Sequence, residues 1–86
     1  MHTVELLEQA LSAAEHAGFS VRQDWFGTGR GGNCQIKGQR WIFLDLSQSP
    51  LEQLDTVLEA LGTVEEPHSV PMPPMLASVV ARRYAA

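Results

Sequence analysis

The stretch WIFLDL, residues 41–46, is apolar at five of its six positions. Just before it, Lys37-Gly38-Gln39 supplies the glycine that tight hairpin turns favour, so residues 33–46 read as two strands joined by a two-residue loop. Side chains alternate between the faces of a sheet, and pairing across such a loop fixes which of them share a face. One face then carries Cys34, Ile36, Trp41 and Phe43, and the other carries Gln35, Ile42, Leu44 and Leu46.

Both faces of residues 41–46 are therefore apolar, which a strand exposed to water on one side does not show. We expect helices to cover one face. The other face needs the C-terminal segment or a second copy of the chain.

Two amphipathic helices are predicted on either side of the strands. Residues 4–17 carry apolar side chains at helical spacing, with Thr3 as the expected N-cap. Residues 50–61 repeat this spacing, and Ser49 with Glu52 forms a capping-box sequence at the start of that helix.

The remaining strand is marked by a change of period. Residues 20–26 alternate with a period of two, which gives the order α-β-β-β-α. We therefore expect an α+β domain over residues 1–64, in which a three-stranded antiparallel sheet packs on the two helices.

The C-terminal part of the chain has a different composition. Four of the five prolines lie within residues 67–74, so residues 65–74 are expected to form an extended arm. Residues 75–86 return to helical spacing, and so short a helix has to dock to be stable. We expect it to lie across the open sheet face of its own chain or of a neighbour. The predicted interaction surface consists of Trp41, Phe43, Leu76, Val79, Val80 and Tyr84.

Charge and composition narrow the classes of partner. Ten acidic and six basic side chains give a formal net charge of −4, which disfavours nucleic acid and anionic membranes as partners. No apolar run reaches the ~18–20 residues that a membrane span requires, and the N-terminal residues do not resemble a signal peptide. With a single cysteine, the sequence favours a soluble cytoplasmic protein.

The segment GTGRGGNC, residues 27–34, contains a G-x-G-x-x-G string. In a dinucleotide-binding fold this string leads into a helix, whereas here a strand follows, so a connection between strands is the favoured interpretation. The alternative is an anion site for phosphate or a nucleotide, formed by backbone amides and an arginine. Its candidate residues are Gly29, Arg30, Gly31, Gly32 and Asn33.

No catalytic or metal-binding constellation stands out. Cys34 has no histidine near it in the predicted layout and is expected to be a small buried side chain. The histidines lack the spacing of a zinc site, so neither a metal nor a cofactor is expected. Trp25 and Trp41 are expected to pack in the core. Asp45, at the end of an apolar strand, is expected to cap the following turn or to meet a basic side chain.

Residues 40–63, RWIFLDLSQSPLEQLDTVLEALGT, resemble the strand–turn–helix of ImmA/IrrE-type zinc peptidases. In that family the helix bears His-Glu-Leu-Gly-His, and this chain has Glu59-Ala60-Leu61-Gly62-Thr63 at the matching positions. Both histidines and the glutamate are absent, so none of the family's functional residues carries over. The resemblance implies a small bacterial relative that kept the scaffold and lost the activity.

These observations favour a non-catalytic interaction or regulatory module, not an enzyme. We expect a homodimer that forms through the sheet face and the C-terminal helix, or the binding of another protein. The alternative function is binding of a small ligand or anion at residues 27–32.

Overall fold

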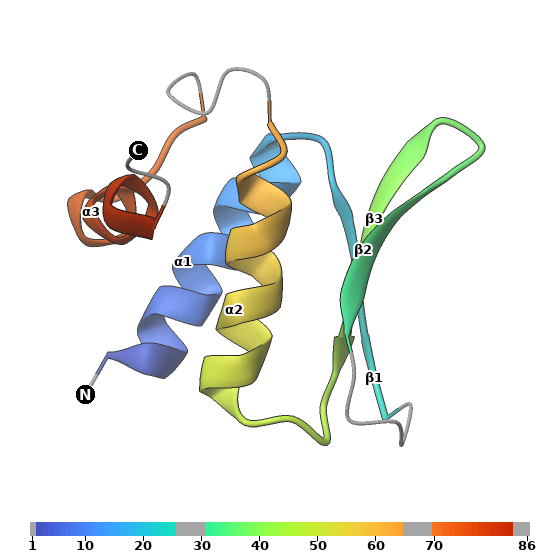
Figure 1. Ribbon diagram of the computed structural model, residues 1–86, viewed down its shortest axis with the longest axis horizontal. Helices are drawn as coiled ribbons and strands as arrows, with labels where there is room; N and C mark the ends of the chain where they lie inside the picture. Colours follow the sequence, from blue (N-terminus) through green and yellow to red (C-terminus); the bar gives the residue numbers. More distant parts are fainter. Residues whose placement is uncertain (1, 26–30, 65–69, 84–86) are drawn as a thin grey trace.

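The computed structural model describes residues 2–25, 31–64 and 70–83 (Figure 1). Its elements confirm the α+β class, with three helices and a three-stranded sheet. In chain order they are α1 (Thr3–His16), β1 (Ser20–Asp24), β2 (Gly32–Ile36), β3 (Gln39–Asp45), α2 (Pro50–Leu61) and α3 (Pro74–Arg83).

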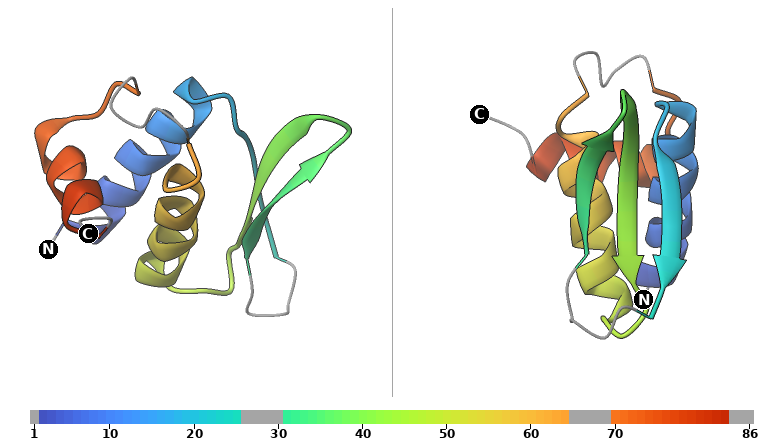
Figure 2. Two further views of the ribbon diagram at one scale, coloured as in Figure 1. Left: turned by 45° about the horizontal axis from the view of Figure 1, so that its top comes forward. Right: turned by 90° about the vertical axis from the view of Figure 1, so that its right-hand side faces the viewer.

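The sheet is mixed, and the prediction of an antiparallel sheet is wrong for β1. The strand order is β1-β3-β2, with β2 antiparallel and β1 parallel to the central β3. A period of two indicates a strand but does not say which strand is its neighbour. Residues 25–31 link β1 to β2, and β2 lies on the far side of β3 (Figure 2).

The β2–β3 hairpin turns within Lys37-Gly38-Gln39, as expected, and its two loop residues are Lys37 and Gly38. Both have positive φ, 51° at Lys37 and 82° at Gly38, which is the backbone of a type I′ turn. The register pairs Ile36 with Gln39 and Cys34 with Trp41, so the predicted alternation of faces is confirmed.

Helices α1 and α2 lie side by side and cover one face of the sheet (Figures 1 and 2). The β3 side chains of Ile42 and Leu44 point into this layer and are completely buried. Small side chains on α1 allow the two helices to approach closely. The core residues at the helices include Ala10, Ala13, Ala14, Val57, Leu58 and Leu61.

Helix α3 packs on α1, on the side of the helical layer that faces away from the sheet (Figure 1). The expectation that it covers the open face of the sheet in its own chain is therefore wrong. Leu76 is completely buried, while Val79 and Val80 are half-buried against the core. Tyr84 lies outside the described residues. Helix α1 thus provides the apolar surface on which α3 docks. The sequence pattern did not distinguish this surface from the open face of the sheet.

The helix ends follow local sequence closely. At α2 the Ser49 Oγ accepts from the Glu52 N–H at 3.2 Å and the Glu52 carboxylate accepts from the Ser49 N–H at 3.1 Å, which confirms the capping box. Helix α1 begins one residue earlier than predicted. Thr3, the expected N-cap, is its first residue, and His2 occupies the N-cap position. At its other end Gly18 has a φ of 99°, the left-handed conformation that ends many helices.

Candidate interaction surface on the open face of the sheet

The face of the sheet that points away from the helices carries two aromatic side chains from β3. Trp41 and Phe43 stack with ring centroids 5.8 Å apart and an interplanar angle of 10°. Both are half-buried. In the right-hand view of Figure 2 the sheet faces the reader, α1 and α2 lie behind it, and none of the described elements lies in front.

The neighbouring strands give this outer face an apolar half and a polar half. On β2, Cys34 lies beside Trp41 in the register and is exposed, and Ile36 is 47% exposed. On β1, Arg22 lies beside Phe43 and forms an ion pair with Asp24 at 3.6 Å. Since both partners are more than half exposed, this pair adds little stability, but it leaves no net charge on the β1 side.

We define the outer face by the residues that the register places on it: Ser20, Arg22, Asp24, Gly32, Cys34, Ile36, Gln39, Trp41, Phe43 and the buried Asp45. The predicted interaction surface is not one surface. Trp41 and Phe43 lie on the outer face, whereas Leu76, Val79 and Val80 belong to α3 on the opposite side of the helices. Tyr84 is not among the described residues.

Three expectations about burial are wrong. Trp41 was expected in the core, but it lies half-buried on the outer face and is not part of the core cluster, because its position in β3 points away from the helices. Cys34 is exposed because β2 is an edge strand whose outer side has no described element over it. Trp25, which follows β1, is 69% exposed and does not pack in the core.

Part of the glycine-rich segment lies outside the described residues, including Gly29 and Arg30. Of the remaining candidates, Gly31 precedes β2 and Gly32 and Asn33 belong to it. A Cβ at Gly31 would lie 2.6 Å from the backbone oxygen of Phe43, so glycine is required there by close packing. This supports the interpretation as a connection between strands, and the anion site stays a prediction.

Asp45 caps the turn between β3 and α2, one of the two roles expected for it. Its carboxylate accepts from the backbone N–H of Ser47 at 2.9 Å and from the Ser47 hydroxyl at 2.7 Å. Its own carbonyl accepts from the Gln48 N–H at 3.0 Å. Although the residue is fully buried, these contacts satisfy acceptors that burial would otherwise leave unpaired.

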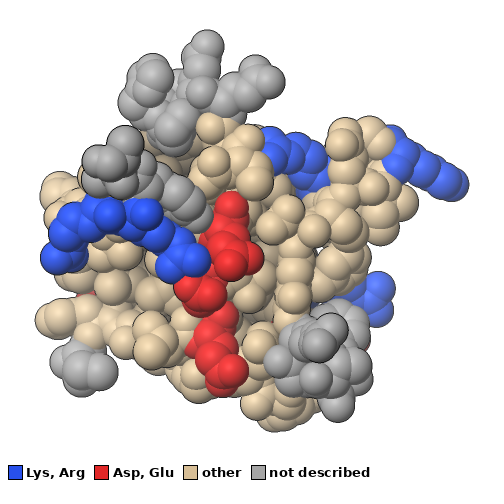
Figure 3. Space-filling view, in the orientation of Figure 1, with Lys and Arg blue, Asp and Glu red and all other residues tan. Residues whose placement is uncertain are grey.

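An acidic ridge runs along the exposed side of α2 and is visible as the red column in Figure 3. It consists of Glu52, Asp55 and Glu59, all exposed as their spacing predicts. Arg83 from α3 reaches it, 2.6 Å from a carboxylate oxygen of Asp55 and 3.8 Å from one of Glu59. The charged part of the surface and the outer face of the sheet thus belong to different layers of the molecule.

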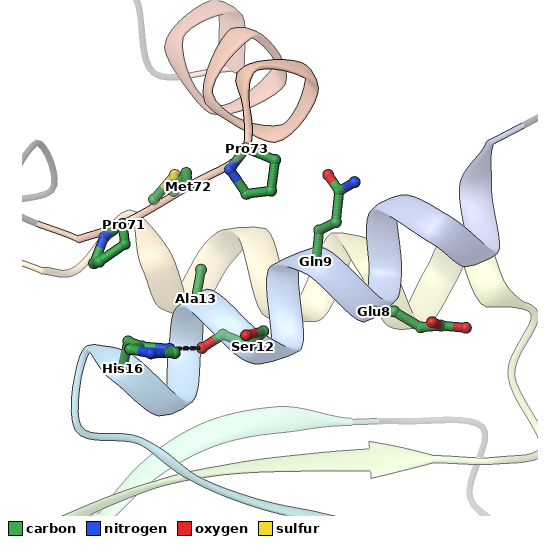
Figure 4. Close-up of a pocket in the computed structure, with 8 residues that line it drawn as sticks. All are labelled: Glu8, Gln9, Ser12, Ala13, His16, Pro71, Met72 and Pro73. Carbon is green, nitrogen blue, oxygen red and sulfur yellow. Dashed lines mark hydrogen bonds between the residues drawn. The ribbon is translucent and has the colours of Figure 1, made fainter.

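A cavity between α1 and residues 71–73 had no counterpart among the predictions (Figure 4). A polar stripe at four-residue spacing on α1, Glu8-Ser12-His16, was the available signal. Among the described residues, no cluster of metal-ligating side chains occurs. Within the same ranges no helix is long and apolar enough to cross a membrane.

Comparisons with protein-family models, curated proteins and solved structures give no match. Residues 40–63 do form a strand, a turn and a helix. Their resemblance to the zinc peptidases stays a prediction.

Proposed function

We propose that this chain is a non-catalytic interaction module that forms a homodimer by packing its outer face against that of a second copy. The observation that carries the proposal is the stacked pair Trp41 and Phe43 on a face over which no described element lies. Aromatic side chains are enriched in protein interfaces because they bury a large apolar area with few rotatable bonds.

Charge does not prevent a second copy from binding at this face. Each chain has a net charge of −4, which makes two copies repel one another, and a contact surface without net charge adds nothing to that repulsion. Among the described residues, the exposed charged side chains of the outer face are the paired Arg22 and Asp24, while the carboxylate of Asp45 in the same register is buried and held by Ser47. In a two-fold arrangement these pairs can also exchange partners between copies.

The size of the face indicates a weak dimer. Three strands about 4.8 Å apart, the longest with seven residues, cover roughly 14 by 23 Å. This is on the order of 300 Å² in projection, well below the ~800 Å² that each partner buries in a typical stable complex. We therefore expect a dissociation constant between about 10 μM and 1 mM.

Sedimentation velocity of the full-length protein over this concentration range tests the proposal. The wild type is expected to shift from monomer to dimer, and Trp41→Thr or Phe43→Thr to weaken the association about tenfold. Threonine keeps strand propensity and removes the ring. Circular dichroism of each variant verifies that the fold is intact.

Leu51→Gln is the matched control, because Leu51 is an exposed apolar side chain on α2 rather than on the sheet. It is expected to dimerise like the wild type. Raising the salt concentration from about 50 to about 500 mM should leave the association unchanged or strengthen it, because salt screens the repulsion between acidic copies. A monomer at every concentration, or equal weakening by Leu51→Gln, contradicts the proposal.

A further inference from the structure

Strand β2 forms one edge of the sheet, and part of its backbone points away from β3. The hairpin pairs Ile36 with Gln39 across a two-residue loop, so this pair and every second pair along the ladder exchange hydrogen bonds. Asn33 and Gln35 fall between those pairs, and their N–H and C=O groups therefore point outward. Among the described residues these groups have no hydrogen-bond partner.

The sequence of β2 does not protect this edge. Natural edge strands commonly carry charged side chains, proline or a bulge, each of which hinders pairing with a further strand. Residues Gly32–Ile36 include no charged residue and no proline, and all five pair with β3 in an uninterrupted register. The other edge, β1, carries Arg22 and Asp24. Strand β2 is thus the edge that is open to a further strand.

The acidic ridge of Glu52, Asp55 and Glu59 lies beside this edge. Strand β2 is the near edge of the sheet in the orientation of Figure 1, and Figure 3 shows the ridge on this same face of the molecule. A Cβ at Gly31, just before β2, would lie 3.5 Å from Cγ2 of Thr56 on α2. Glu52 and Glu59 are four residues before and three residues after Thr56, so they share its side of the helix.

The charge of the ridge distinguishes between the strands that this edge can accept. Antiparallel pairing of β2 with the β2 of a second copy places both α2 helices on the same side of the joined sheet, where the two ridges repel one another. A segment with lysine or arginine is attracted instead. Arg83 already binds at the far side of the ridge, 2.6 Å from a carboxylate oxygen of Asp55. Charge complementarity therefore favours a basic partner over a second copy.

We propose that β2 binds an extended basic segment of another protein as a fourth, antiparallel strand of the sheet. The backbone of the segment pairs with the N–H and C=O groups of Asn33 and Gln35, as in other cases of strand addition. The proposal does not depend on the dimer, because the segment binds at the edge of the sheet and leaves Trp41 and Phe43 on the outer face uncovered.

The register predicts an alternating sequence for the segment. Asn33 pairs with the buried Ile42, so the side chains of Asn33 and Gln35 lie on the helix side of the sheet. Residues directly opposite one another in an antiparallel pair share a face, so the residues that bond to Asn33 and Gln35 also point to this side. There, lysine or arginine can reach Glu52 and Glu59. The residues between them lie on the outer side and can be apolar.

The dimensions of the two elements agree with this pattern. Alternate residues of a strand are about 6.8 Å apart, so three basic positions span about 14 Å. Glu52 and Glu59 are seven residues apart on α2, which corresponds to about 10 Å along the helix. The flexible side chains of lysine and arginine bridge the remaining difference.

The basic residues near β2 leave this approach open. Arg40 lies opposite Gln35 in the register, but its guanidinium donates to the Thr63 hydroxyl and its Cζ lies 4.3 Å from the ring centroid of Phe19. The guanidinium is therefore turned towards the C-terminal ends of α1 and α2. Lys37 belongs to the hairpin turn, beyond the end of β2.

The test uses a synthetic peptide, acetylated and amidated, in which three arginines alternate with valines between terminal threonines. It is titrated at about 20 mM salt into ¹⁵N-labelled full-length protein, and amide shifts are followed by NMR. We expect saturable binding with a dissociation constant between about 100 μM and 1 mM, and the largest shifts at residues 32–36 and 52–59. Hydrogen exchange of the Asn33 and Gln35 amides should become slower when the peptide binds.

Two methylated peptides separate strand addition from charge attraction alone. Methylation of the arginine amides keeps every charge but removes the N–H groups that face β2, and it is expected to weaken binding about tenfold. Methylation of the valine amides, which point away from β2, is the matched control and should change the affinity less than about twofold. Equal binding of the two methylated peptides overturns the proposal.

Three protein variants complete the test. Glu59→Gln should weaken binding about threefold, whereas Glu15→Gln removes the same charge from an exposed position on α1 and should bind like the wild type. Trp41→Thr, which weakens the proposed dimer, should also bind the peptide normally, so the two proposals can fail separately. The proposal is also overturned by shifts centred elsewhere or by an equal loss in Glu15→Gln. Protection of the Asn33 amide that grows with protein concentration alone would place a second copy on this edge and overturn it as well.

Discussion

The two adjacent glycines before and at the start of β2 differ sharply in what surrounds them. A Cβ added at Gly31 would lie 2.6 Å from the backbone oxygen of Phe43, whereas one at Gly32 would meet nothing within 4 Å. Carbon and carbonyl oxygen approach to about 3.3 Å in close contacts, so Gly31→Ala requires a shift of roughly 0.7 Å between two backbone segments. Such overpacking costs about 1–3 kcal/mol.

Equilibrium unfolding in urea measures this difference. For a domain of this size the free energy of unfolding falls by about 1 kcal/mol per molar urea, so Gly31→Ala should lower the midpoint by about 1–3 M. Gly32→Ala is the matched control, and it should keep or slightly raise the midpoint because alanine restricts the unfolded chain. Equal midpoints for the two variants would refute the packing argument and remove the structural explanation for glycine at this end of the loop.

Three further changes test the docking of α3, the start of α2 and the hairpin turn, each by the same urea unfolding. Leu76→Ala should cost about 2–5 kcal/mol, because the side chain is completely buried; no change would contradict the docking of α3. Ser49→Ala should cost about 1 kcal/mol by removing the capping box, and an unchanged midpoint would show that α2 does not need it. Lys37→Asn should stabilise by about 0.5 kcal/mol, since asparagine tolerates the positive φ of this turn better than lysine; a loss of stability would contradict the type I′ assignment.

Local features of the sequence predicted most of the elements. The hairpin at Lys37-Gly38 and the capping box at Ser49 depend on residues close together in the chain, and the structure has both. Partnerships between distant segments were harder to predict. The parallel pairing of Ser20 with Trp41 and the docking of Leu76 depend on which apolar surfaces meet, and a periodic pattern shows only that each surface exists.

Contacts between distant segments also decide which residues of the candidate sites are exposed and which lie together. Cys34 was placed on the correct face, but its exposure follows from β2 being an edge strand, which the sequence pattern does not specify. The cavity at Gln9 forms where α1 meets Pro71-Met72-Pro73, far apart in sequence, so neither segment alone indicates it.

The two faces of β3 differ in chemistry as well as in cover. The side turned to the helices carries the aliphatic Ile42 and Leu44, which belong to the core and are both completely buried. The side turned away carries the aromatic Trp41 and Phe43, which cover each other by stacking and so tolerate partial exposure in a monomer. If the proposed dimer forms, this division suits a strand whose own chain covers the first face permanently and whose partner covers the second face transiently. The apolar pattern of β3 indicated that both faces need cover, and under this proposal the kind of apolar side chain distinguishes the two covers.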